Sequence, residues 1–274
     1  MRQVDRSSVN APHNLNNLTA VNELQLESHT TVSSAVYRHQ NVKDSLQELY
    51  FDKCYICECD VKGGYKVEHY LPKKHFPSLG YTWSNLHKAC EGCNLAKEHK
   101  DFLVTDATGT VIDINLLDPS NPNYNISDYM RFNINSEAEL VPVGTDPAVI
   151  AKAQNTIKYL NGQYKNEYGK ELKHQRGSRS HHLLLFMYKQ LSQFNELIQQ
   201  IKRAGIAQYT APQCPNELDM HHQLCNKLIA LDHMYLSDRA PFSSCTRVSM
   251  VQSLEMPYQS LVDMKEKMRA TLGI

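Results

Sequence analysis

Two pairs of cysteines with the same internal spacing constrain this 274-residue chain more than any other feature. Cys54 and Cys57 form the first C-x-x-C pair, and Cys90 and Cys93 form the second, with 32 residues between them. Each pair places two thiolates on one side of a metal ion, and two pairs complete a tetrahedral site that suits Zn²⁺. Common zinc ribbons separate their pairs by roughly 15–20 residues, so a sizeable element is inserted here. We predict a structural four-cysteine zinc site, with Cys59 outside it.

Composition is typical of a globular protein of the cell interior. Hydrophobic residues make up 41% of the sequence, which is enough to bury a core and argues against global disorder. The first ten residues are polar and no apolar run follows them, so we expect no signal peptide. The most apolar stretch, Leu183 to Tyr188, is far too short to cross a bilayer. We therefore predict a cytoplasmic protein without a membrane partner, in which clustered cysteines bind metal rather than form disulfides.

Charged residues are balanced in total but not along the chain. The 29 basic and 29 acidic residues cancel, so the overall charge gives no indication of nucleic-acid binding. Residues 62–100 carry seven Lys or Arg and three acids, and residues 152–203 carry ten and three. Between these two basic blocks, residues 101–150 carry one Arg and eight acids. A basic block can contact nucleic acid, and a solvated helix face explains it equally well.

The pattern of apolar and turn residues predicts an α+β fold in three parts. Residues 1–49 form an N-terminal arm with short helices, residues 50–116 a small module with Gly63-Gly64 as a hairpin turn, and residues 117–274 a mainly helical domain. A hairpin is expected between Met130 and Val143, and Asp146-Pro147 is typical of a helix start. The predicted C-terminal helices span 148–160, 180–204, 217–236 and 258–272.

The chain between and just after the cysteine pairs carries groups that suit hydrolysis of a phosphodiester. Glu68 and His69 are adjacent, Asn85 follows within the insert, and Asn94 and Lys97 come directly after the second pair. Such a reaction needs a hard cation held by oxygen ligands and a base that deprotonates the attacking water. It also benefits from positive charge near the phosphate. A purely structural zinc site needs none of these groups.

In this order, the residues from the first cysteine pair onward resemble the HNH endonuclease family, whose fold is also described as ββα-metal. The resemblance covers about a sixth of the chain and implies a role for each matching residue. Glu68 takes the place of a metal-binding acidic residue, His69 that of the general base, and Asn85 that of an asparagine that orients the loop. Asn94 stands where the family has a His or Asn metal ligand, which makes this the H-N-N variant.

Two departures from the family pattern bear on the metal. The family usually has Asp where this chain has Glu68, and Asn94 is neutral, so few protein ligands hold the cation. Water and phosphate oxygens complete its coordination, which favours Mg²⁺ or Mn²⁺ as the catalytic metal and leaves Zn²⁺ at the cysteines. Lys97, Lys73 and Lys74 are the predicted substrate contacts. For the two loop lysines, an exposed position without a ligand is nearly as good an explanation.

A narrower resemblance extends over most of the chain. The strings that carry it are Met1-Arg2-x-x-Asp5-Arg6-Ser7, Leu116-Leu117-Asp118-Pro119 and Thr156-Ile157-x-x-Leu160-Asn161. In these strings the chain resembles the HNH nuclease subunit of Septu-type anti-phage systems, some of which accompany retrons. The resemblance implies an effector nuclease bound to a partner ATPase, in some systems with a retron reverse transcriptase and its DNA–RNA product.

The predicted function is a metal-dependent endonuclease that cuts nucleic acid, with DNA favoured, and two alternatives stay open. One is a non-catalytic zinc-stabilised module that binds nucleic acid or protein, and Glu68, His69 and Asn94 argue against it. The other is a stand-alone restriction or toxin-like HNH nuclease. A neighbouring ATPase gene favours the defence complex over the stand-alone enzyme.

Overall fold

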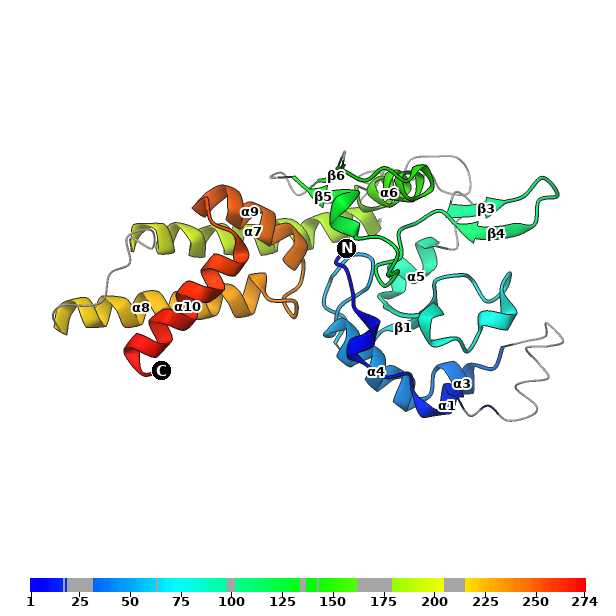
Figure 1. Cartoon of the computed structure of the whole chain (residues 1–274), viewed down its shortest axis with the longest axis horizontal. Coiled ribbons are helices and arrows are strands. Elements are labelled where there is room, and N and C mark those ends of the chain that lie inside the picture. The colour runs from blue at the N-terminus through cyan, green and yellow to red at the C-terminus, as the bar shows by residue number, and fades with distance from the viewer. Residues whose placement is uncertain are drawn as a thin grey trace. The chain divides into compact units, whose positions relative to one another are not determined.

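A computed structural model describes residues 1–16, 18, 32–62, 64–97, 102–133, 137–141, 143–161, 179–204 and 215–274 (Figure 1). Within these residues the chain forms two compact units. The first joins residues 1–131 with 138–183, and the second joins 132–137 with 184–274. Helices predominate and the described strands form two-stranded sheets, so the predicted α+β class is confirmed. The division at residues 49 and 116 stays a prediction.

Short helices and paired strands alternate over the first 160 residues. The 3₁₀ turns are η1 (Arg6–Ser8), η2 (Pro77–Leu79), η3 (Trp83–Asn85) and η5 (Ile126–Asp128). The α-helices are α1 (His13–Asn16), α3 (Ser34–Tyr37), α4 (Gln40–Tyr50), α5 (Glu91–Lys97) and α6 (Pro147–Leu160). The strand pairs are β1 (Lys66–His69) with β2 (Leu86–Ala89), β3 (Leu103–Thr105) with β4 (Val111–Ile114), and β5 (Met130–Phe132) with β6 (Ala138–Leu140).

Helix α4 packs against the β1–β2 strand pair because its apolar residues recur at helical spacing. Val42, Leu46, Leu49 and Tyr50 are all buried, which is the pattern of one helix face. The helix contacts strand β2. Phe51 ends the helix in the left-handed conformation, with φ of 50°. The chain then turns toward the first cysteine pair.

Strands β1 and β2 form an antiparallel hairpin. Glu68 lies opposite His87, and His69 lies opposite Leu86. Helix α5 begins two residues after β2 ends, and it contacts β1. The observed order is therefore strand, strand, helix. The hairpin turn that the sequence predicts includes Gly63, which lies outside the described residues.

Helix α6 anchors the parts of the chain that follow the β1–β2 hairpin and helix α5. Asp146 caps its first turn and Pro147 is its first residue, as the sequence predicts. The hydroxyl of Thr156 accepts the N–H of Leu117 at 2.9 Å. At the end of the helix, the amide of Asn161 exchanges two hydrogen bonds with the first residue of β6. The loop after β4 and the β5–β6 hairpin are thus both anchored on this helix.

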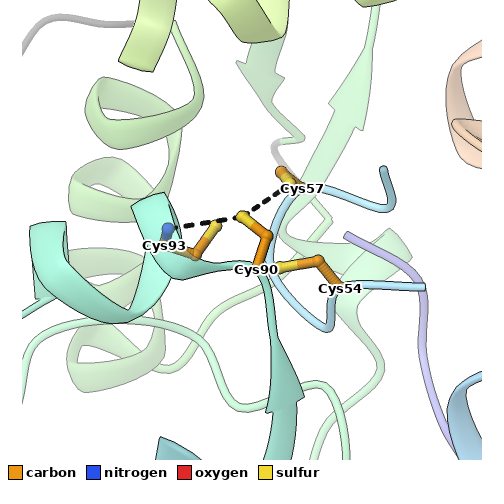
Figure 2. A group of neighbouring side chains, drawn as sticks. All are labelled: Cys54, Cys57, Cys90 and Cys93. Carbon is orange, nitrogen blue, oxygen red and sulfur yellow. Dashed lines mark hydrogen bonds between the residues drawn. The ribbon is translucent and has the colours of Figure 1, made fainter. Parts of the chain in front are cut away.

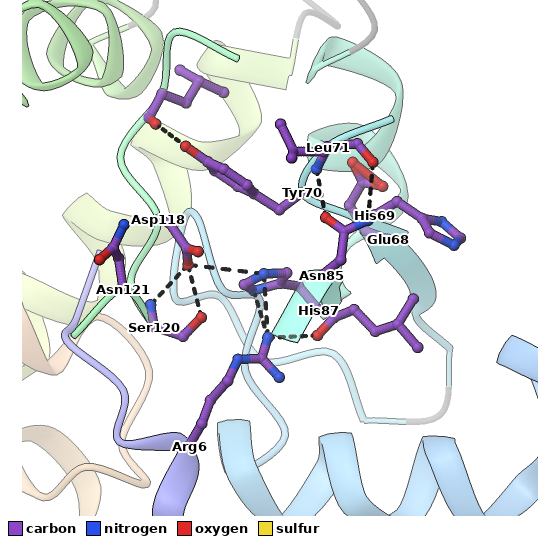
Figure 3. Close-up of polar contacts among 12 residues, drawn as sticks. Arg6, Glu68, His69, Tyr70, Leu71, Asn85, His87, Asp118, Ser120 and Asn121 are labelled. Carbon is purple, nitrogen blue, oxygen red and sulfur yellow. Dashed lines mark hydrogen bonds and ion pairs between the residues drawn. The ribbon is translucent and has the colours of Figure 1, made fainter. Parts of the chain in front are cut away.

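Arg6 ties the N-terminal segment to strand β2 (Figure 3). Its guanidinium donates to the carbonyl oxygens of Trp83 at 2.8 Å and Leu86 at 2.7 Å. It also lies 3.2 Å from Nε2 of the buried His87, whose Nδ1 is 2.7 Å from the hydroxyl of Tyr50. Burial and the nearby guanidinium hold the pKa of His87 well below its usual range. The imidazole is therefore neutral, and Arg6 is the cation of this cluster.

Asp118 supplies the negative charge beside Arg6 and His87. One carboxylate oxygen lies 3.8 Å from Nε2 of His87 and accepts the N–H and the hydroxyl of Ser120, both at 2.8 Å. Burial raises the pKa of Asp118, and the hydrogen bonds from Ser120 oppose that shift. The N–H of Val4 donates a hydrogen bond to the carbonyl oxygen of residue 119, which follows Asp118. Residues 1–7 and 116–119 are therefore packed together beneath β2.

The second unit is helical. In the C-terminal hundred residues the structure has α7 (Arg179–Arg203), α8 (Pro215–Leu231), the π-helical turn η7 (Asp232–Leu236), α9 (Ser243–Leu254) and α10 (Tyr258–Leu272). Its core includes Phe194, Ile198, Leu228, Leu261 and Met268, all fully buried. No helix among the described residues is both long and apolar enough to cross a membrane.

The predicted C-terminal helices match α6, α7, α8 and α10 closely, and η7 continues α8 to residue 236. The predicted hairpin near residues 130–143 is also present as β5 and β6. Helix α9 was not predicted. It buries the small residues Ser243, Cys245, Thr246 and Ser249, so it lacks the large apolar stripe that identifies an amphipathic helix.

We expect Arg6→Gln to destabilise the first unit by about 2–3 kcal/mol, because two backbone carbonyls lose charge-assisted hydrogen bonds. Trp83, the single tryptophan of the chain, lies next to Arg6, so its fluorescence during urea unfolding reports on this unit. The matched control is Arg131→Gln, which removes an exposed ion pair with Glu139 and should cost below about 1 kcal/mol. Equal shifts of the urea midpoint in Arg6→Gln and Arg131→Gln would contradict the anchoring role of Arg6.

Candidate functional site

The four predicted zinc ligands form one cluster (Figure 2). Their sulfur atoms all lie within 4.8 Å of one another, and those of Cys57 and Cys90 are 3.9 Å apart. A tetrahedral zinc site with bonds of about 2.3 Å separates its sulfurs by about 3.8 Å. Cys54 and Cys57 lie in the turn after α4, Cys90 lies between β2 and α5, and Cys93 lies in the first turn of α5. The cluster can therefore hold one Zn²⁺ ion.

Hydrogen bonding within the cluster favours the thiolate form of Cys57 and Cys90. The N–H of Cys93 donates to the sulfur of Cys90 at 3.3 Å. Hydrogen bonds from Cys54 and its neighbours lower the pKa of Cys57, and they lower the pKa of Cys90 to about 4. Burial instead raises the pKa of Cys54. Cys59 stays outside the group of four, and its sulfur lies 3.2 Å from that of Cys57.

We expect Cys90→Ser to remove the bound zinc and with it the folded first unit, because zinc binding and folding are coupled in small modules. Metal analysis of purified wild-type protein should give about one zinc per chain, and the variant should give far less. Cys225→Ser is the control, because Cys225 is buried in the helical unit outside the cluster. A Cys90→Ser protein that keeps its fold and its Trp83 fluorescence would contradict a structural role.

The other predicted site residues line a separate cavity of about 360 Å³. It forms where β1 ends, beside helices α3 and α5. Glu68 and His69 come from the end of β1, and Asn94 and Lys97 come from α5, three residues apart. The complete lining consists of Tyr37, Arg38, Val67, Glu68, His69, Pro72, Lys73, Lys74, His75, Asn94, Lys97 and Leu103.

His69 is held with one ring nitrogen turned to the backbone. Its Nε2 lies 2.9 Å from the carbonyl oxygen of Gly80, and a carbonyl can only accept, so Nε2 carries the proton. The edge of the Tyr37 ring packs against the imidazole, with 4.7 Å between centroids. Burial lowers the pKa of His69 to about 4. The neutral ring therefore presents Nδ1 with a free lone pair at neutral pH.

Glu68 is buried next to a positive charge. The ammonium of Lys97 donates to its carboxylate and also to the backbone carbonyl of His69. The side chain of Lys97 is only 1% exposed, so this lysine sits beneath the cavity rather than on its rim. The arrangement gives the buried carboxylate an oppositely charged partner, and an unpaired charge there would be costly. The substrate contact predicted for Lys97 stays a prediction.

Asn85 lies outside the cavity and holds the loop that forms its wall (Figure 3). Its amide oxygen accepts the N–H of Leu71 at 2.7 Å, and its amide nitrogen donates to the carbonyls of Leu71 and Leu79 at 3.1 and 3.2 Å. These three bonds tie the chain after β1 to the turn before β2. Leu71 precedes the cavity residues 72–75, so Asn85 acts on the site through the backbone.

Three further cavity residues did not emerge from the sequence as site residues. Tyr37 and Arg38 come from α3 and the residue after it, about thirty residues before Glu68 and His69, so no local spacing marks them. The hydroxyl of Tyr37 accepts a hydrogen bond from the ammonium group of Lys73 at 2.7 Å. His75 follows the two loop lysines and is an exposed part of the cavity wall.

The cavity wall is basic. Arg38, Lys73, Lys74 and Lys97 contribute four positive charges, and Glu68 contributes the one carboxylate. A cavity with this balance attracts anions, and its arginine and lysine side chains are the usual donors to phosphate oxygens. A carboxylate, an imidazole and an amide therefore meet within a site suited to a phosphate group.

No protein-family model matches the chain. A comparison with curated proteins finds a partial match to the Septu protein PtuB of Bacillus thuringiensis. The match is 38% identical over 71 residues, which is 25% of this chain. It spans only 28% of the length of PtuB. The chain is similar to PtuB over this stretch. The similarity supports the relation to Septu proteins that the short sequence strings predict.

Proposed function

We propose that this chain is a metal-dependent HNH endonuclease that hydrolyses phosphodiester bonds in nucleic acid. The observation that carries the proposal is the meeting of Glu68, His69 and Asn94 in one basic cavity above a zinc-type cysteine cluster. The strand, strand, helix order of β1, β2 and α5 agrees with the ββα-metal fold of that family.

In the proposed reaction, His69 is the general base. Its Nε2–H is held by the carbonyl of Gly80, which leaves Nδ1 to accept a proton from the attacking water. Burial keeps the imidazole neutral and therefore competent at neutral pH. Tyr37 packs against the ring and limits its rotation. Asn85 acts as a positioning residue, because its amide fixes the loop beside the base.

The oxygen atoms of Glu68 and Asn94 are the groups that would hold the catalytic cation. Both line the cavity, and carboxylate and amide oxygens suit Mg²⁺ or Mn²⁺. When bound, such a cation supplies charge stabilisation to the scissile phosphate. Arg38, Lys73 and Lys74 line the same cavity, and in the proposed reaction they bind the phosphate oxygens and orient the ester.

We expect His69→Ala to lower the rate of plasmid cleavage by about 10²- to 10⁴-fold in the presence of Mg²⁺ or Mn²⁺, the usual contribution of a general base. The control is His233→Ala, an exposed histidine of the helical unit. Circular dichroism and zinc content show whether each variant is folded. Equal cleavage by wild type and a folded His69→Ala protein would disprove the assignment. Parallel reactions with single-stranded DNA, duplex DNA and RNA identify the substrate.

The pairing of Lys97 with Glu68 favours a second candidate, a binding module without catalysis, because a lysine already neutralises the proposed metal ligand. The two candidates differ in what happens when the lysine is removed. A nuclease uses Glu68 to bind a divalent cation in the same place. A binding module has no use for a cation there.

We expect Lys97→Met to destabilise the first unit by about 3–5 kcal/mol without divalent cations, because the buried Glu68 carboxylate loses its partner. Added Mn²⁺ should restore part of this loss by binding Glu68, which Trp83 fluorescence can follow during urea unfolding. The control is Lys152→Met, which breaks a more exposed pair with Asp113 and should show no Mn²⁺ response. The absence of a Mn²⁺ effect in Lys97→Met would favour the binding module.

The biological role that we propose is anti-phage defence. The similarity to PtuB and the three strings shared with Septu-type nuclease subunits support it. In that role the chain is the effector nuclease of a complex with an ATPase subunit, and in a retron-associated system also with a reverse transcriptase and its DNA–RNA product. Co-purification with the products of the neighbouring genes tests the complex. Loss of protection against phage in a His69→Ala strain tests the effector role.

A further inference from the structure

A second cavity of about 480 Å³ lies at the other end of the β1–β2 hairpin, and neither the motif nor the proposed reaction uses it. We call it the lysine cavity. Helix α4, the turn after the first cysteine pair, the start of β1 and the end of β2 contribute to its wall. Its lining consists of Lys43, Gln47, Asp52, Val61, Lys62, Gly64, Tyr65 and Lys88.

Lys88 and Asp52 form the fixed part of this cavity. The ammonium of Lys88 is 2.9 Å from the Asp52 carboxylate and 4.2 Å from the centroid of the Tyr65 ring. The side chain of Lys88 is 1% exposed, so its position is set by packing. The hydroxyl of Tyr65 donates to the backbone carbonyl of Lys43 at 2.6 Å, which joins the start of β1 to helix α4. The wall of the cavity is therefore rigidly built.

The positive charge of the lysine cavity exceeds its negative charge. Asp52 compensates Lys88, which leaves Lys43 and Lys62 at the rim. Lys62 is 3.4 Å from Asp60, and both side chains are largely exposed, so this pair is weak and readily exchanged. Lys43 makes no ion pair with any residue in the described parts of the chain. Two ammonium groups are thus available to an anion.

The two cavities are neighbours along the hairpin. Val67 lines the cavity of His69, and Lys88, directly opposite Val67 in the sheet register, lines the lysine cavity. Four residue steps along β1 separate Tyr65 from His69, which corresponds to about 13 Å. A nucleic-acid strand advances about 3.4 Å per nucleotide. The separation of the lysine cavity from His69 therefore corresponds to about four nucleotides of a strand.

We infer that the lysine cavity is a second phosphate subsite, which binds the backbone of the substrate strand about four nucleotides from the scissile phosphate. The inference rests on the proposed nuclease function and names the part of the substrate that the site requires. The ligand chemistry is a chain of phosphodiesters, because a single phosphate cannot bridge the two cavities. A chain with no net charge has no long-range attraction for nucleic acid, so local contacts of this kind must supply the affinity.

The test is the double variant Lys43→Gln/Lys62→Gln, made in a His69→Ala background that binds without cutting. Fluorescence anisotropy measures affinity for a labelled 20-nucleotide single strand and its duplex, without added Mg²⁺ or Mn²⁺. Loss of two phosphate contacts should weaken binding roughly 25- to 60-fold at 0.1 M salt and reduce the salt slope by about 1.4–1.8. The matched control, Lys158→Gln/Lys267→Gln, removes two exposed lysines from α6 and α10.

The same lysine changes in an otherwise wild-type chain separate this inference from the proposed function. Hydrolysis of bis(p-nitrophenyl) phosphate needs only the site of His69, so the double variant should cleave it at the wild-type rate while it cuts the 20-mer more slowly. Failure of the wild type to cleave either substrate would overturn the nuclease proposal. The anisotropy measurement of 20-mer affinity would still test the subsite in that case. Equal 20-mer affinity in the double variant and its control would overturn the subsite. Inorganic phosphate that competes for binding as well as the 20-mer does would also overturn the subsite.

Discussion

The four-cysteine cluster is the constraint on which the rest of the first unit depends. Strands β1 and β2 have four residues each, and a hairpin of that size is not stable alone in water. The cluster joins the turn after α4 to the start of α5, and so closes the segment that contains the hairpin. Glu68, His69, Asn85 and Asn94 all lie within this closed segment or at its end. The geometry of the candidate site is therefore set by chain ends that meet at the cysteine cluster rather than by a large sheet.

Buried and half-buried cations complete what the cluster begins. Arg6 holds the carbonyls on either side of Asn85, and Asn85 in turn holds the loop beside His69. Lys97 holds Glu68 against β1 from the other side, and Lys88 fixes the wall of the lysine cavity. Each of these charges has a described partner, which is the condition for a stable buried ion. The site is thus positioned by polar contacts as much as by apolar packing, and single changes there have local effects on geometry.

The sequence revealed the parts of this arrangement that depend on short spacing. The C-x-x-C pairs, the adjacent Glu68 and His69, and the helical periods of α6, α7, α8 and α10 are all local patterns, and the structure brings the motif residues into the places that such patterns imply. Tyr37 and Arg38 reach the cavity only through tertiary packing, so no spacing could identify them. Helix α9 buries small polar residues, which leave no hydrophobic period. Long-range contacts and small-residue packing are thus what sequence patterns miss.

The zero net charge conceals how the charges are used. Acids of the 101–150 segment are engaged in the first unit, since Asp113 pairs with Lys152 and Asp118 is buried beside Arg6 and His87. The lysines near the hairpin instead surround two cavities in which few carboxylates compete with them. A chain built this way presents local positive charge without an overall field. Under the proposed function, binding to nucleic acid depends on simultaneous contact at both cavities, which favours a long strand held in register over a short one.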